Sequence, residues 1–122
     1  MLILASARRL WHFTEAAYHL IPDEKDYESV RNTMRSDIYD PKIGADLYHR
    51  FIDEWMLADE IGLNIMVNEH HQTPTCLNSA APLMLAILAR VTKNARLLLL
   101  GNPIANRNQP AAGIARAFPS SA

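Results

Sequence analysis

The sequence has very little cysteine and no long hydrophobic run, and each shortage excludes a class of protein. Cys76 is the only cysteine in 122 residues, so an internal disulfide and a multi-cysteine zinc site are both excluded, which fits a reducing compartment. The longest apolar runs, 82–89 and 97–100, are far shorter than the roughly 20 residues of a membrane-spanning helix. The apolar residues 1–5 precede the first basic residues, which is the reverse of a secretory signal. We therefore expect a cytoplasmic protein that does not associate with membranes.

An excess of charge of one sign is also absent. Twelve basic and thirteen acidic residues give a formal net charge of −1. Nucleic-acid-binding domains usually carry a broad basic surface, so we expect no nucleic-acid partner. A hydrophobic content of 49% and a charged content of 20% are typical of a folded globular chain, and the length allows one domain at most.

Hydrophobic periodicity predicts a long helix over residues 43–61. Apolar side chains recur there at spacings of three and four, which puts them on one stripe that faces the core: Ile43, Leu47, Phe51, Trp55, Ala58 and Ile61. Asp40 is a typical N-cap, Pro41 suits the first helical position and Gly62 suits the end of the last turn. The charged segment 22–41 is expected to be a surface loop with a short helical turn, or a functional loop.

Short apolar runs near residues 10–14, 63–67 and 96–100 are typical of buried strands, and a second helix is expected over 80–93. Strands that alternate with helices predict parallel βα units. Because the strands are continuously apolar, we expect both faces of the sheet to be covered. The second helix is apolar on all sides in its first two turns, so both its faces should contact protein.

Polar residues directly follow the second and third predicted strands, at the sheet edge where α/β proteins bind ligands. Glu69, His70 and His71 could provide a general base, a hydrogen-bond donor to an anion, metal ligands, or a structural pair that bridges loop carbonyls. Metal binding is the weakest alternative, because adjacent residues on an extended segment point in opposite directions and no partner with zinc-site spacing is recognisable. Cys76 lies in no nucleophile motif and is expected to be an inert thiol.

Several short blocks, in this order, carry a family resemblance: Asp40-Pro41, Leu47-Tyr48, Asp53-Glu54, Ala58-Asp59-Glu60-Ile61-Gly62, Val67-Asn68-Glu69-His70-His71-Gln72 and Leu100-Gly101-Asn102-Pro103. Over roughly residues 12–110 the chain resembles the N-terminal part of the bacterial luciferase-like, flavin-dependent monooxygenases. The Asn-Glu-His-His block at the end of the second predicted strand is the most specific element of this resemblance.

The resemblance implies an α/β fold that is the N-terminal part of a (β/α)8 TIM barrel, with about three βα units. It implies an enzyme that uses reduced FMN and oxygen to oxidise a small organic substrate, with the reduced flavin supplied by a separate flavin reductase. It assigns catalytic roles to His70 and Glu69, and flavin-binding roles to Asn68, His71, Gly101 and Asn102. His70 would lie beside the flavin ring and help to stabilise or deprotonate the oxygenated intermediate, while Glu69 and His71 would hold the loop.

The chain also departs from the family. A (β/α)8 barrel typically needs about 250 residues, whereas this sequence has 122. We expect residues 1–110 to form part of the barrel, and 111–122 to be a divergent tail. The isolated chain is then expected to be truncated and inactive and to bind little or no FMN. The alternative is a non-catalytic fragment that acts only by associating with itself or with a full-length relative through an exposed barrel edge.

Overall fold

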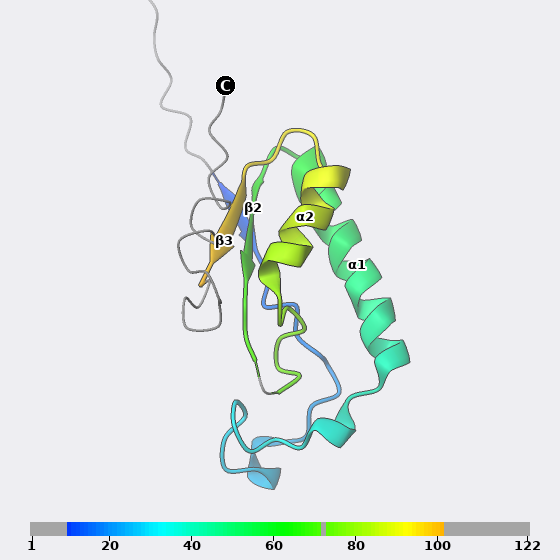
Figure 1. Ribbon diagram of the computed structural model, residues 1–122, viewed down its shortest axis with the longest axis vertical. Coiled ribbons are helices and arrows are strands. Elements are labelled where there is room, and N and C mark those ends of the chain that lie inside the picture. Colours follow the sequence, from blue (N-terminus) through cyan, green and yellow to red (C-terminus); the bar gives the residue numbers. More distant parts are fainter. Residues whose placement is uncertain (1–9, 72, 102–122) are drawn as a thin grey trace, which may run out of the picture.

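Three parallel strands and two α-helices alternate along the chain in the computed structural model, which describes residues 10–71 and 73–101 (Figure 1). The strands are β1 (Trp11–Phe13), β2 (Asn64–Asn68) and β3 (Leu97–Leu100), the α-helices are α1 (Pro41–Glu60) and α2 (Ala81–Val91), and two short 3-10 helices are η1 (Glu24–Asp26) and η2 (Ser36–Ile38). The sheet order is β1-β2-β3, and both pairings are parallel. The predicted α/β class and order of elements are therefore confirmed, while the predicted tail over 111–122 lies outside the described residues.

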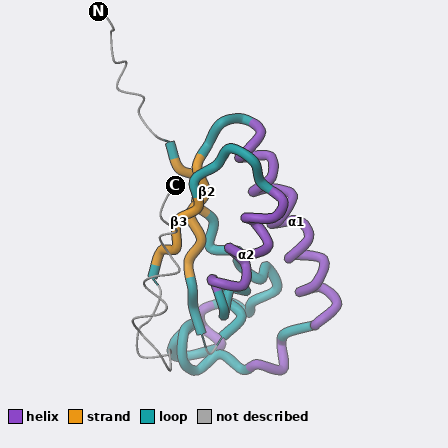
Figure 2. Tube along the Cα trace, turned by 45° about the horizontal axis from the view of Figure 1, so that its top comes forward, coloured by secondary structure: helices purple, strands orange, loops and turns teal. Residues whose placement is uncertain are grey.

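Both α-helices cover the same face of the sheet, as Figures 1 and 2 show from two directions. The chain steps through the sheet in one direction, from β1 to β2 to β3. Right-handed crossovers that step in one direction place their helices on one side, as in a singly wound sheet. Among the described residues, helices cover one face only, so the expectation that both faces of the sheet are covered is wrong for this part of the chain.

The sheet has one buried face, which packs against the helices, and one more exposed face. Ile65 and Val67 in the central strand are completely buried and pack in the core with Trp55 of α1 and Leu88 of α2. The alternate residues of the sheet lie on the other face, where Phe13 pairs in register with Met66 and is exposed. Apolar side chains on this second face account for the continuous hydrophobicity of the strands.

Local interactions fix both ends of α1 as the sequence predicts. The Asp40 carboxylate accepts hydrogen bonds from two backbone N–H groups of the first turn, at 2.8 and 3.4 Å, and Pro41 is the first helical residue. Gly62 adopts the left-handed conformation with φ of +82°, which a residue without Cβ takes without strain. Ile61, predicted as part of the core stripe, is 65% exposed because it lies beyond the last helical turn.

Helix α2 buries only one stripe. Ala81, Met84 and Leu88 face the core, whereas Leu83 is 70% exposed and Ile87 is also exposed. The expectation that both faces of this helix contact protein is therefore wrong within the described part of the chain. In that part, neither helix is long and apolar enough to cross a membrane.

A buried carboxylate closes the edge of the sheet where the strands begin. Asp59, near the end of α1, accepts hydrogen bonds from the backbone N–H groups of Lys93, Asn94 and Ala95 at 2.8, 2.8 and 2.5 Å. These hydrogen bonds lower the pKa of Asp59 below its ordinary value, because they stabilise the charged form. The connection between α2 and β3 is thereby fixed to α1 at the edge opposite the polar loops.

Candidate functional site

Two loops meet beyond the carboxyl ends of the strands. The long connection between β1 and α1 and the loop between β2 and α2 lie at the same end of the molecule in Figure 1. Backbone hydrogen bonds join them: Leu77 donates to the carbonyl of Ala16 at 3.0 Å, and Tyr18 donates to the carbonyl of Pro74 at 3.3 Å. The polar residues predicted from the sequence are thus held in a defined loop pair.

The side-chain amide of Asn68, the last residue of β2, has a hydrogen-bond partner for its oxygen but none for its nitrogen within the described residues. The residue is 4% exposed, and its Oδ1 accepts a hydrogen bond from the Cys76 thiol with a 3.6 Å distance to Sγ. Its Nδ2 has no hydrogen-bond partner within residues 10–71 and 73–101. A buried donor without a partner costs about 1–3 kcal/mol, so this amide is a position where a ligand acceptor would be favoured.

Glu69 connects the loop to the beginning of α2. Its buried carboxylate accepts a hydrogen bond from the backbone N–H of Ala81 through Oε2 at 3.0 Å, where the helix dipole favours negative charge. Its Oε1 lies 3.1 Å from Nε2 of His71, which also lies 3.1 Å from the carbonyl oxygen of Ser79. These contacts hold the loop that carries His70.

His70 faces a different set of partners. Its Nδ1 lies 3.0 Å from Nη1 of Arg31, and its Nε2 lies 3.4 Å from Oε2 of Glu15. The two histidines therefore point toward separate groups, as expected for neighbours on an extended segment. Sequence reasoning missed both partners of His70. Glu15 could have been found, because it follows the first predicted strand closely, whereas nothing in the sequence marks Arg31.

A cavity of about 340 Å³ lies beside these residues. Its walls come from both loops and from α1, and include Ser36, Tyr39, Tyr48, His70, His71, Thr73, Pro74, Cys76, Leu77 and Ser79. The Tyr48 hydroxyl donates a hydrogen bond to the carbonyl of Leu77, and burial raises the pKa of this phenol. Burial also raises the pKa of the Cys76 thiol, because the charged form is less well solvated there.

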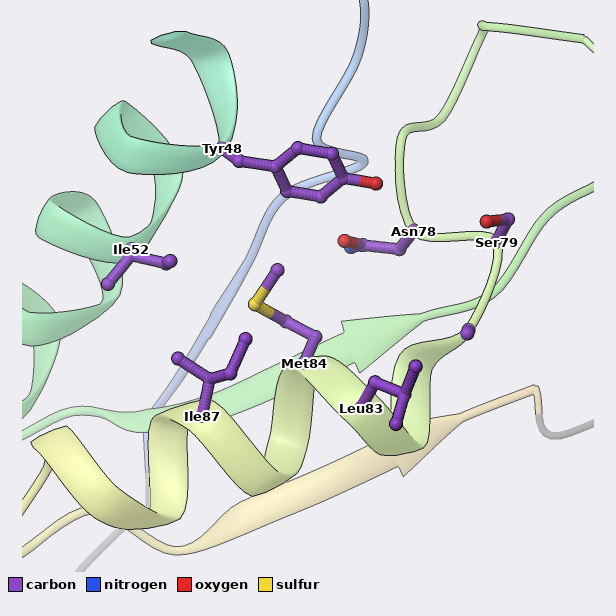
Figure 3. A pocket seen from close by; sticks show the side chains of 8 residues that line it. Tyr48, Ile52, Asn78, Ser79, Leu83, Met84 and Ile87 are labelled. Atoms are coloured by element: carbon purple, nitrogen blue, oxygen red, sulfur yellow. The ribbon is translucent and has the colours of Figure 1, made fainter. Parts of the chain in front are cut away.

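A second cavity of similar volume lies between α1 and α2, on the helix side of the loops (Figure 3). In Figure 3, Ile52 of α1 faces Met84 and Ile87 of α2, and Asn78 points its amide toward the space between Tyr48 and Met84. This cavity is mostly apolar, although it shares Tyr48 and Ser79 with the first cavity. It is therefore a poorer match for the polar residues that the sequence singles out.

The remaining predicted positions follow β3. Gly101 is exposed and left-handed, with φ of +72°, so its backbone is open at the strand end. Asn102 lies outside the described residues. Within the described ranges, no three His, Cys, Asp or Glu side chains are grouped as metal ligands would be.

Comparisons with known proteins did not identify a relative of this chain. No family model, no curated protein and no solved structure matches the chain. The membership in the luciferase-like family that the sequence predicts therefore stays a prediction.

Proposed function

We propose that this chain is the N-terminal part of a luciferase-like (β/α)8 barrel and that its polar sheet edge belongs to an FMN-dependent monooxygenase site. Two properties of the fold support the proposal. The three strands are parallel and follow one another in sequence order, with both helices on one face. Barrels of this kind wind in one direction and bind their ligands at the carboxyl ends of the strands.

The observation that carries the functional part of the proposal is the unpartnered amide of Asn68. This buried donor lies at the carboxyl end of the central strand. The flavin ring system presents carbonyl oxygens and ring nitrogens that accept hydrogen bonds. An acceptor of this kind would satisfy the Nδ2 group and offset its desolvation cost.

The neighbouring residues fit the same ligand. Gly101 offers open backbone at the end of the adjacent strand, and His70 provides a polar ring beside the cavity. Glu69 and His71 fix the loop that carries His70. The flavin, when bound, supplies the redox chemistry with oxygen, while the protein supplies binding, orientation and exclusion of water. A single sheet edge contacts only one side of such a ligand, so the isolated chain should bind FMN weakly.

A substitution of Asn68 tests the proposal. Asn68→Leu removes the donor at nearly constant volume, so FMN affinity should fall several-fold while the free energy of unfolding rises by about 1 kcal/mol. Flavin fluorescence during titration measures the first quantity, and urea unfolding measures the second. Asn94→Ala, an exposed asparagine at the opposite edge, is the matched control and should change neither. Unchanged FMN affinity in Asn68→Leu, or a clear loss of stability, would contradict the functional role.

The alternative function is that of a non-catalytic chain that associates with itself or with a full-length relative. The exposed apolar side chains of Trp11 and Phe13 on the uncovered sheet face favour it. Large exposed apolar patches and open sheet edges promote such contacts. Loss of flavin binding together with retained self-association would favour this alternative over the enzyme.

A further inference from the structure

We propose that Arg31 is a positioning residue that fixes the tautomer of His70, so that His70 acts as a hydrogen-bond donor through Nε2 and not as a general base. The tautomer follows from contacts within the chain. Its catalytic meaning rests on the proposed function, because an imidazole between the two loops has a role in oxidation only if flavin and substrate bind there.

The contact between Arg31 and His70 determines where the imidazole proton lies. A guanidinium group has only donors and stays protonated in proteins. The 3.0 Å distance between Nη1 and Nδ1 is a hydrogen bond only if Nδ1 offers its lone pair. In the neutral ring the proton then lies on Nε2.

Glu15 supports the same assignment from the other side of the ring. Its Oε2 lies 3.4 Å from Nε2, and an ionised carboxylate can only accept. One nitrogen of His70 therefore faces a group that must donate, and the other faces a group that must accept. Because Glu15 lies just after β1 and Arg31 lies further along the connection to α1, the ring is oriented by residues from outside its own loop.

Among the roles that the sequence left open for His70, this arrangement favours that of a hydrogen-bond donor to an anion. A base at Nε2 needs a free lone pair there, whereas the contact between Arg31 and Nδ1 assigns the proton of the neutral ring to Nε2. The Glu15 carboxylate marks a position near this N–H group where a negatively charged oxygen lies, with a 3.4 Å distance between Oε2 and Nε2. A ligand or substrate that develops an anionic oxygen at this position would accept a hydrogen bond from Nε2 and take the place of the Glu15 carboxylate, whose side chain is nearly half exposed.

Nitrogen NMR of the imidazole rings tests the inference without flavin. The 15N resonances of His70, assigned by their loss in His70→Gln, should show a protonated Nε2 and an unprotonated, hydrogen-bonded Nδ1. In Arg31→Ala the Nδ1 resonance should move toward that of the exposed His19 and His49 in their neutral form. Arg31→Lys, which keeps a charged donor, should restore part of the shift.

Arg35→Ala is the matched control, because Arg35 lies in the same connection but pairs with Asp37. It should leave the His70 resonances unchanged. A proton on Nδ1 in the unmodified chain, or an unchanged Nδ1 resonance in Arg31→Ala, would overturn the inference. If the resonances behave as expected while the Asn68→Leu titration shows no flavin effect, the tautomer assignment stands and the proposed function fails.

Discussion

Asp59 and Glu69 are buried carboxylates at opposite edges of the same sheet, and each accepts backbone hydrogen bonds. Asp59 closes the edge where the strands begin, with three N–H donors from the connection between α2 and β3. Glu69 fixes the loop at the other edge, through the N–H of Ala81 and the ring of His71. At the scale of single residues, the first supports folding and the second shapes the candidate site.

Removing the charge of Asp59 should destabilise the protein in a pH-dependent way. Asp59→Asn should lower the free energy of unfolding at neutral pH by about 1–3 kcal/mol, since charge-assisted hydrogen bonds are lost. The pKa of Asp59 is lowered in the folded state, so its contribution is present above the unfolded value of about 3.9 and is lost as pH falls through the folded value. Urea unfolding at several pH values measures this, with Asp53→Asn, an exposed carboxylate of the same helix, as the control.

If the difference in the free energy of unfolding between the unmodified chain and Asp59→Asn stays constant down to acid pH, the backbone N–H groups do not stabilise the charge of Asp59. An effect of Asp53→Asn of equal size would mean that general helix electrostatics explains the result.

The Cys76 thiol should react slowly with thiol reagents in the native protein. It is buried, and its raised pKa leaves little thiolate at neutral pH. Labelling followed by absorbance should be slow without denaturant and should accelerate greatly in urea concentrations that unfold the chain. Native labelling as fast as that of the unfolded chain would contradict the buried position beside Asn68.

At the scale of elements, the sequence predicts those features that residues close together in the chain determine. The limits of α1 follow from Asp40, Pro41 and Gly62, which all act within one or two turns. The contacts of the candidate site depend on residues distant in sequence, since Arg31 and His70 are separated by 39 positions. No periodic pattern encodes such a contact, so the loop and its histidines were predicted while the partners of His70 were missed.

Gly44 in the first turns of α1 should be intolerant of a methyl group. A Cβ there would overlap the ring of Tyr39, which packs against Tyr18 with a centroid distance of 5.3 Å. Although alanine favours a helix over glycine by about 1 kcal/mol, overpacking costs about 1–3 kcal/mol, so Gly44→Ala should reduce the melting temperature. Ala45→Gly at the exposed neighbouring position measures the contribution of helix propensity to stability alone. Stabilisation by Gly44→Ala would show that Tyr39 moves away without cost.

At the scale of the whole molecule, the fold is a sheet with helices on one face. The described residues of the other face include exposed apolar side chains at Trp11, Phe13 and Leu100. In a closed barrel the corresponding face is the packed interior. If the chain is part of such a barrel, these apolar side chains belong to a packed interior that the described residues do not complete. We therefore expect the chain to associate with itself through this face.

The chain should associate with itself through the uncovered sheet face. Sedimentation velocity should show a sedimentation coefficient that rises with concentration, because association removes apolar surface from water. Phe13→Lys should shift the equilibrium toward the monomer, whereas Leu83→Lys on the exposed stripe of α2 should have little effect. The reverse pattern would place the contact on the helices, and a concentration-independent monomer would contradict the prediction.

The central claim is that the carboxyl edge of β2 faces a flavin, and chemical-shift mapping tests it most directly because it detects weak binding. Backbone and side-chain amide spectra of the 15N-labelled chain would be recorded as FMN is added to millimolar concentration. We predict saturable shifts at the Asn68 side-chain amide, His70 and Gly101, with residues near Asp59 unchanged. Saturable shifts confined to the groove between α1 and α2, with Asn68, His70 and Gly101 unchanged, would contradict the account.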